Sequence, residues 1–175
     1  MKLKKLLALA LAGVLMLTLL TGCSGGGSTA EDRFIAEAVA DIFKRIYPNT
    51  EVSYSVPALT STIRPAFTPD WFQKDEAGNI YALNENFPTD AGLPLGDFLK
   101  ESLKAYAQSN HVSFIAFDST GMSASEQAEK FASGAPSLPV YPSGASPSVN
   151  TKLRVGVRHK TVEGREYCLI VIVRT

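Results

Sequence analysis

The end of the chain carries the pattern that most constrains the fold, two apolar segments separated by a short turn. In KLRVGVRHK, residues 152–160, apolar and basic side chains alternate, as in a strand with one buried face. REYCLIVIV, residues 165–173, is apolar at successive positions, which is typical of a strand buried on both faces. Gly164 lies between them in TVEGR and suits a tight turn. We therefore predict a C-terminal hairpin whose second strand is central in a sheet.

Two capping-box patterns mark the starts of helices. Ser28 and Glu31 are three residues apart, and apolar residues at helical spacing follow them as far as Pro48. Ser123 and Glu126 repeat the pattern before a shorter amphipathic segment. Both segments are predicted to pack one apolar face on the sheet.

The rest of the chain adds further elements. EVSYSV at 51–56 alternates like a half-buried strand, a helical apolar stripe covers 95–109, and VSFIAF at 112–117 reads as a buried strand. Residues 134–150 are rich in Pro, Ser and Gly and are predicted to form a long surface loop. The fold class predicted is α+β, a single domain with a central, mostly antiparallel sheet and helices packed on it, similar to an α/β/α sandwich.

The N-terminus has the layout of an export signal. Three lysines among the first five residues precede an apolar run over 6–20, shorter than the roughly twenty residues that a permanent membrane span needs. Leu20, Thr21, Gly22 and Cys23 then resemble the lipobox of bacterial lipoproteins. This resemblance implies cleavage before Cys23 and a diacylglyceryl group on its thiol. The alternative is a protein that is simply secreted, or held by an uncleaved helix.

The lipobox divides the chain into a signal peptide at 1–22, a lipidated cysteine with a flexible tether at 23–30, and one extracytoplasmic domain at 31–175. Two acyl chains give durable anchoring, whereas one holds a protein only marginally. The predicted location is the cell membrane, lipid-anchored at its extracytoplasmic face. Because Ser24 and not aspartate follows the cysteine, resemblance to lipoprotein sorting rules implies no retention at the inner membrane of a two-membrane host.

Charge gives no reason to expect nucleic acid as a partner. The chain has 17 basic and 17 acidic residues, but the signal peptide contains three of the basic ones and none of the acidic ones. The predicted mature chain is therefore slightly acidic. From Asn150 onward, however, basic residues exceed acidic ones, so the C-terminal hairpin either faces anionic lipid or wall polymer, or carries solvated charges.

Few residues suit catalysis. Cys168 is the only cysteine besides Cys23 and lies in YCLIVIV, where a small buried hydrophobe is expected. His111 and His159 are the only histidines; His111 is the better candidate base, and His159 is predicted to be solvated beside the turn. Motifs for structural zinc, phosphate-binding loops and serine nucleophiles are absent, and no cofactor or metal is predicted.

The segment after residue 68 offers carboxylates and aromatic rings. Asp70, Asp75 and Glu76 form a weak acidic cluster, either an acid/base group or a solvated turn. Four aromatic residues nearby either line a ligand cleft or cover a small core; they are Trp71, Phe72, Tyr81 and Phe87.

The second half is similar in element order to the CAP superfamily of secreted proteins. The stretches that carry this resemblance are AGLPLGDFLKESLKAYAQSN, SFIAFDSTGMSASEQAEKFASG and LRVGVRHKTVEGREYCLIVIV. That family builds its cleft from two histidines and two acidic residues, within Gly-Glu-Asn and Gly-His-Arg motifs, and neither motif occurs here. The resemblance therefore implies a degenerate member without the cleft metal site, and no functional residue is carried over.

Two functions remain open. The preferred hypothesis is a non-enzymatic, lipid-anchored domain that binds a ligand, an envelope protein or a wall polymer. The alternative is an envelope hydrolase, CAP-like or otherwise, that uses His111 with a carboxylate such as Asp70 or Asp75, which must come within hydrogen-bond reach or one water of the ring.

Overall fold

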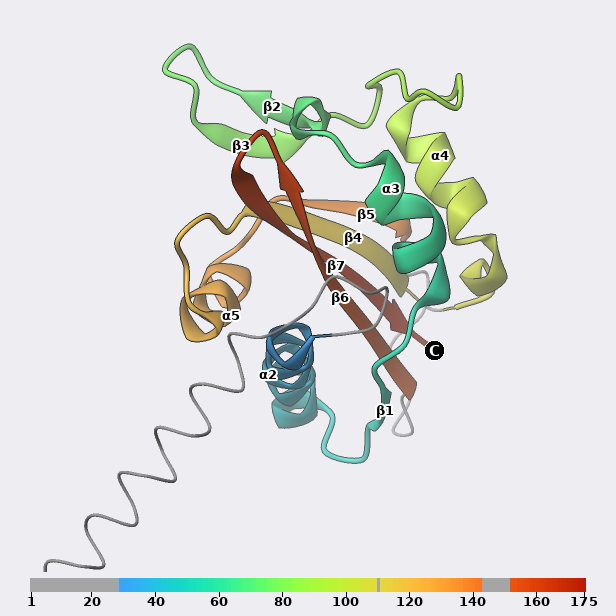
Figure 1. Cartoon of the computed structure of the whole chain (residues 1–175). Helices are drawn as coiled ribbons and strands as arrows, with labels where there is room; N and C mark the ends of the chain where they lie inside the picture. Colours follow the sequence, from blue (N-terminus) through green and yellow to red (C-terminus); the bar gives the residue numbers. More distant parts are fainter. Residues whose placement is uncertain (1–28, 110, 143–151) are drawn as a thin grey trace, which may run out of the picture.

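The C-terminal hairpin is the centre of a five-stranded sheet in the computed structural model, which describes residues 29–109, 111–142 and 152–175 (Figure 1). Strands β6 (Lys152–Val162) and β7 (Arg165–Arg174) pair antiparallel, and the strand order β1-β6-β7-β4-β5 puts β7 in the middle. Glu163 and Gly164 both have positive φ, 52° and 79°, as two-residue hairpin turns require. The predicted hairpin and its central strand are confirmed.

The other three strands complete a mostly antiparallel sheet. β4 (His111–Asp118) pairs antiparallel with β7 and with β5 (Ser137–Tyr141), whereas β1 (Glu51–Ser53) is parallel to β6. Alternate residues of β7 enter two separate apolar clusters, one on each face of the sheet. A strand buried on both faces needs this continuous apolar sequence.

Helices cover both faces, so the predicted α+β sandwich is confirmed. On one face lie α2 (Ala30–Ile46) and α5 (Ala124–Ala132), which contact each other. The other face is covered by the π-helical turn η1 (Leu59–Ile63), by α3 (Arg64–Ala66) and by α4 (Leu95–Ser102). Figure 1 shows these two groups on opposite sides of the β6–β7 hairpin.

The N-cap of the first helix lies one residue later than predicted. Thr29, not Ser28, is the N-cap: its side chain accepts from the Asp32 amide, and the Asp32 carboxylate accepts from the Thr29 amide. Aspartate at the third helical position serves as glutamate would, since both supply a carboxylate. Ser28 lies outside the described residues, as do the predicted signal peptide, the lipobox and Cys23. The second capping box, Ser123 with Glu126, is confirmed.

Several boundaries differ from the prediction. The predicted loop at 134–150 includes edge strand β5, because Leu138 and Val140 alternate inward and Pro139 is tolerated at an edge. The remaining loop residues 143–151 lie outside the described residues. α4 ends at Ser102, and the 3-10 turn η3 (Lys104–Tyr106) replaces its predicted end. β1 stops at Ser53, after which Val56 lies directly over Gly156 of β6.

A two-stranded hairpin projects from this body at the top of Figure 1. A 3-10 turn, η2 (Pro69–Trp71), leads into β2 (Phe72–Lys74), which pairs with β3 (Ile80–Leu83). Proline opens the η2 turn, and Thr68 caps it by accepting from the Asp70 amide.

No helix among the residues described here is both long and apolar enough to cross a bilayer.

Candidate functional site

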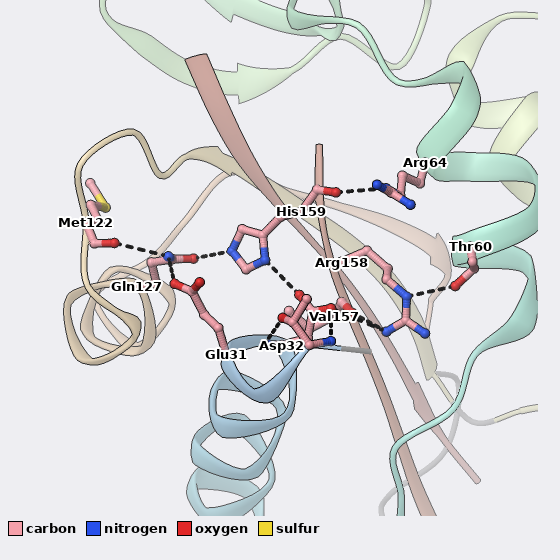
Figure 2. Close-up of polar contacts among 10 residues, drawn as sticks. Glu31, Asp32, Thr60, Arg64, Met122, Gln127, Val157, Arg158 and His159 are labelled. Atoms are coloured by element: carbon pink, nitrogen blue, oxygen red, sulfur yellow. Dashed lines mark hydrogen bonds and ion pairs between the residues drawn. The ribbon is translucent and has the colours of Figure 1, made fainter. Parts of the chain in front are cut away.

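His159 is mostly buried, whereas it was predicted to be solvated. Its side chain is 12% exposed, because alternation along β6 directs it to the sheet face that α2 and α5 cover. Figure 2 shows the ring between Asp32 of α2 and Gln127 of α5. Both of these partners are themselves buried, at 2% and 0% exposure. Three elements far apart in the sequence therefore meet at one imidazole. We call the four residues around it the histidine cluster: Glu31, Asp32, Gln127 and His159.

Hydrogen bonds define the protonation state of this ring. His159 Nδ1 lies 2.7 Å from Asp32 Oδ1, and Nε2 lies 2.7 Å from Gln127 Oε1. The Gln127 amide nitrogen donates to Glu31 Oε1 at 2.8 Å and to the Met122 carbonyl at 3.3 Å, which orients its oxygen toward His159. Both ring nitrogens thus face acceptors, and only an imidazolium has two N–H donors. The geometry is that of a charged histidine.

Electrostatics agree with this assignment. Burial alone lowers the pKa of His159, but the hydrogen bond and charge of Asp32, with smaller effects of Glu31 and Glu166, leave the pKa raised above 6.5. Arg158 adds a second cation beside Asp32, with Nη1 3.8 Å from Oδ2, and its Nε donates to Thr60. The cluster is a charged network with donors matched to acceptors.

The cluster has residue types of a cysteine nucleophile site but not its arrangement. Cys168 is the cross-strand partner of His159, and Asp32 lies on the other side of the ring. However, both ring nitrogens are already bonded, and burial, with the charges of Asp32 and Glu31, raises the pKa of the Cys168 thiol well above its usual range. A reactive cysteine requires the opposite shift and an exposed sulfur. The prediction that Cys168 is a buried hydrophobe is confirmed.

His111 and the carboxylates predicted to act with it, Asp70 and Asp75, lie at opposite ends of the sheet. His111 opens β4 opposite Arg174, and burial together with that positive charge lowers its pKa. Within the described residues it has no ion pair with a carboxylate. Asp70 lies near Tyr167, which pairs with Asp118 at the far end of β4, about 23 Å away at the usual strand rise. The predicted pairing of His111 with this segment is therefore not formed.

The carboxylates after residue 68 occupy turns. Asp75 accepts from the backbone amides of Ala77 and Asn79 and from the Asn79 side chain, and these bonds lower its pKa. Asp70 and Glu76 are exposed. These contacts match the alternative of a solvated turn.

The aromatic residues of this segment separate into core and surface. Trp71 and Phe72 are 0% and 6% exposed, and Trp71 packs edge-to-face against Phe67. These two therefore belong to the core, and the interpretation that they line an open cleft is wrong. Phe87 is partly buried against the same core, whereas Tyr81 is 62% exposed on β3.

A polar hollow of about 600 Å³ opens beside this hairpin, and its size is typical of ligand sites. Its walls come from β2–β3, the end of β4, the start of β7, and the region around α5. The charged side chains around it, which the sequence analysis missed as a group, are Lys74, Asp118, Lys130 and Arg165. Only the basic excess after Asn150, to which Arg165 belongs, pointed toward them.

Positive charge is in excess at this hollow. Arg165 Nη2 lies 2.6 Å from Asp118 Oδ2, so these two charges neutralise each other. The ammonium groups of Lys74 and Lys130 have no hydrogen bond or ion pair within the described part of the chain. A smaller adjoining hollow of about 250 Å³ is lined by Lys74 together with Asp70 and Glu163, neither of which lies within ion-pair distance of the lysine. Two ammonium groups thus remain unpaired around the main hollow.

No protein-family model matches this chain, and searches of curated proteins and of solved structures find no match either. The lipobox and CAP resemblances therefore stay predictions from sequence. Across residues 29–109, 111–142 and 152–175, no group of three or more metal-ligating side chains is placed to hold an ion.

Proposed function

We propose that this chain is a lipid-anchored extracytoplasmic domain that binds, without catalysis, a phosphate-bearing ligand in the polar hollow. The observation that carries the proposal is the pair of unpaired ammonium groups, Lys74 and Lys130, around one concave surface. Concave sites with a few convergent charges are the usual ligand sites of proteins.

Phosphate suits these groups better than carboxylate. Lysine acts as a point charge and is a common phosphate ligand, whereas a planar carboxylate is best recognised by the two-pronged arginine. The one arginine at the hollow, Arg165, is already paired with Asp118. Two other polar groups nearby are also engaged: Thr120 Oγ1 accepts from the Glu166 amide, and Asn79 donates to Asp75. Recognition through two point charges predicts modest affinity and strong salt dependence.

The predicted anchor places this site close to envelope phosphates. A Gly/Ser-rich tether of about eight residues has an end-to-end distance near 15 Å, so the domain stays beside the membrane surface. Phosphate esters there belong either to lipid headgroups or to polymers and solutes outside the membrane. Among the described residues, His111, His159 and Cys168 do not form a catalytic pair of a nucleophile and a general base. This favours binding over hydrolysis.

The test is calorimetric titration of the full chain, carrying Cys23→Ser, with a soluble glycerol-phosphate oligomer. We expect saturable binding that the double variant Lys74→Ala/Lys130→Ala weakens at least about tenfold, the equivalent of about 1.4 kcal/mol. The matched control is Lys44→Ala/Lys100→Ala, which removes two helix lysines that do not line the hollow and are paired with Asp41 and Asp97.

Three further arms complete the test. Vesicles of phosphatidylglycerol, compared with phosphatidylcholine, distinguish headgroups from soluble phosphate. A neutral maltotriose titration measures binding that needs no charge. Intact mass of the wild-type chain shows whether Cys23 carries the lipid. Binding of neither phosphate probe, or equal loss in both double variants, would overturn the proposed ligand class and site.

A further inference from the structure

We propose that the proton on His159 controls the affinity of the polar hollow, by holding α5 in place against α2 and β6. This inference rests on the proposed function, because it assigns a regulation to the same site. It concerns the histidine cluster, which takes no part in ligand contact and is connected to the hollow through α5.

The hydrogen bonds form a continuous chain across three elements. Asp32 is fixed in α2 by its capping-box bond to the Thr29 amide, and its other oxygen accepts from His159 Nδ1. The opposite ring nitrogen donates to Gln127 in the middle of α5. Figure 2 shows His159 as the link between the start of α2 and α5. Apart from Gln127, the side chains of α5 are exposed or half-buried, so apolar packing alone holds this helix weakly.

The same helix carries one wall of the hollow. Met122 lies just before α5, Lys130 is within it and Pro136 follows it, and all three line the hollow. The Met122 carbonyl also accepts from the Gln127 amide nitrogen. A shift of Gln127 therefore moves the backbone of Met122, a lining residue, directly. It also moves the helix that positions the Lys130 ammonium.

Loss of the proton breaks this chain at one bond. The proton leaves Nε2 for solvent, because Nδ1–H remains bonded to the carboxylate of Asp32. The ring then presents a lone pair to Gln127 Oε1, and two acceptors face each other at 2.7 Å. Rotation of the amide would relieve this contact only by losing its bonds to Glu31 and Met122. Either way, α5 loses one buried polar attachment, the hydrogen bond of Gln127 to His159 or the one to Glu31.

Charges on the elements around His159 determine whether its ring keeps the second proton. Glu31 and Asp32 of α2 and Glu166 of β7 favour it, whereas Gln127 is the neutral contribution of α5. The remaining groups are cationic or neutral: Arg158 on β6, Arg64 of α3, which donates to the His159 carbonyl, and the protonated Cys168 thiol on β7. The acidic groups outweigh burial, so the imidazolium persists above pH 6.5 and is lost as pH rises further. A domain outside the membrane is exposed to such changes in the medium.

The experiment measures affinity for the glycerol-phosphate oligomer between about pH 5.5 and pH 8.5, a range in which phosphodiesters do not titrate and histidine does. We expect affinity to fall by about fivefold as pH rises, at the lower end of typical allosteric couplings. His159→Gln should remove this pH dependence. His111→Gln is the matched control, since it removes the only other histidine and should leave the pH profile unchanged.

A second readout separates this inference from the proposed function. The protection factors of the α5 amides, which are hydrogen-exchange rates corrected for the intrinsic rise of exchange with pH, are measured without ligand. They should fall over the same pH range in the wild-type chain and not in His159→Gln. If His159→Gln does not fold, the exchanged pair Glu31→Gln/Gln127→Glu replaces it. That pair conserves charge and puts a carboxylate on Nε2, so both transitions should move to higher pH.

The outcomes are distinct. If the chain binds the oligomer at no pH, the proposed ligand class is wrong and so is the control of its affinity. The exchange data then still test whether His159 attaches α5. Binding with a flat pH profile overturns the inference and leaves the binding function intact. A pH profile that survives in His159→Gln also overturns it, as do α5 protection factors that do not change with pH.

Discussion

The histidine cluster and the polar hollow hold similar numbers of charged groups but satisfy them differently. In the cluster, Asp32 and His159 are almost excluded from solvent and every hydrogen-bonding atom named above has a partner. At the hollow, Arg165 is 66% exposed while paired with Asp118, and the two lysines are unpaired within the described residues. Burial requires satisfied charges, whereas water can stabilise unpaired ones.

This difference supports a structural role for the histidine cluster and the proposed ligand-binding role of the hollow. A buried network with no free donor or acceptor cannot bind anything further without losing an internal bond. An exposed ammonium group can exchange water for a ligand's oxygen at little cost. The reactive residue types lie in the cluster, yet the site proposed for the ligand is the hollow. Substitutions that separate stability from binding test this distinction.

The largest effect is expected for Asp32→Ala. The substitution leaves the His159 imidazolium and Arg158 without their buried carboxylate, which typically destabilises by about 3 to 5 kcal/mol. Urea denaturation followed by circular dichroism measures this change. Thr29→Ala is the control, because it removes the capping hydroxyl of the same box while the Asp32 carboxylate stays, and it should cost about 1 kcal/mol. Equal effects of the two substitutions would mean that the carboxylate acts only as a cap.

The next effect is a pH dependence of stability. The pKa of His159 is raised in the folded state above 6.5 by Asp32, Glu31 and Glu166 despite its burial. Its contribution to the free energy of unfolding is therefore fully present below pH 6.5 and is lost as pH rises through the higher folded pKa. A charge-assisted hydrogen bond is worth about 1.5 to 3 kcal/mol, which sets the expected loss.

Denaturation of wild type, His159→Gln and His111→Gln over this pH range measures that effect. The pKa of His111 is lowered by burial and Arg174, so its own contribution has the opposite sign and weakens below pH 6.5. A decline above pH 6.5 that persists in His159→Gln would contradict the assignment of the proton to this ring.

The sequence predicted the elements with strong local patterns. The continuous apolar run of β7, the alternation of β6 and the Ser123–Glu126 box each match one periodicity or one cap, so the fold class followed from them. Edge strand β5 was missed because Pro139 and the neighbouring Gly and Ser residues resemble a loop. The inward alternation of Leu138 and Val140 was the available signal.

The sites were harder to predict because they depend on contacts between distant segments. His159 is followed by a lysine and a nearby turn, a local setting that favours solvent exposure, yet its burial is decided by α2 and α5, separated from it by 127 and 32 residues. Lys74 and Lys130 likewise become neighbours of one hollow only through the packing of the β2–β3 hairpin and α5. No local period encodes such pairings.

A small effect is expected for Arg165→Ala at the hollow. Although Arg165 and Asp118 are only 2.6 Å apart, the arginine is mostly exposed, and exposed ion pairs contribute about 0.2 to 1 kcal/mol. The same denaturation assay at low and high salt checks this value, since salt should remove most of it. A loss as large as that of Asp32→Ala would show that the hollow also contributes to the core.

The smallest effect on stability is expected for Lys74→Ala/Lys130→Ala, although it has the largest expected effect on binding. Neither ammonium has a partner in the described chain, so the substitutions break no bond, and surface changes of this kind stay within about 0.5 kcal/mol. Unfolding at equilibrium with and without the glycerol-phosphate oligomer measures both properties in one assay. The ligand should stabilise the wild-type chain and not the variant, because only a bound ligand shifts the folding equilibrium. If the variant is instead destabilised without ligand, the lysines have partners within the fold, and the contrast between a satisfied cluster and an unsatisfied hollow fails.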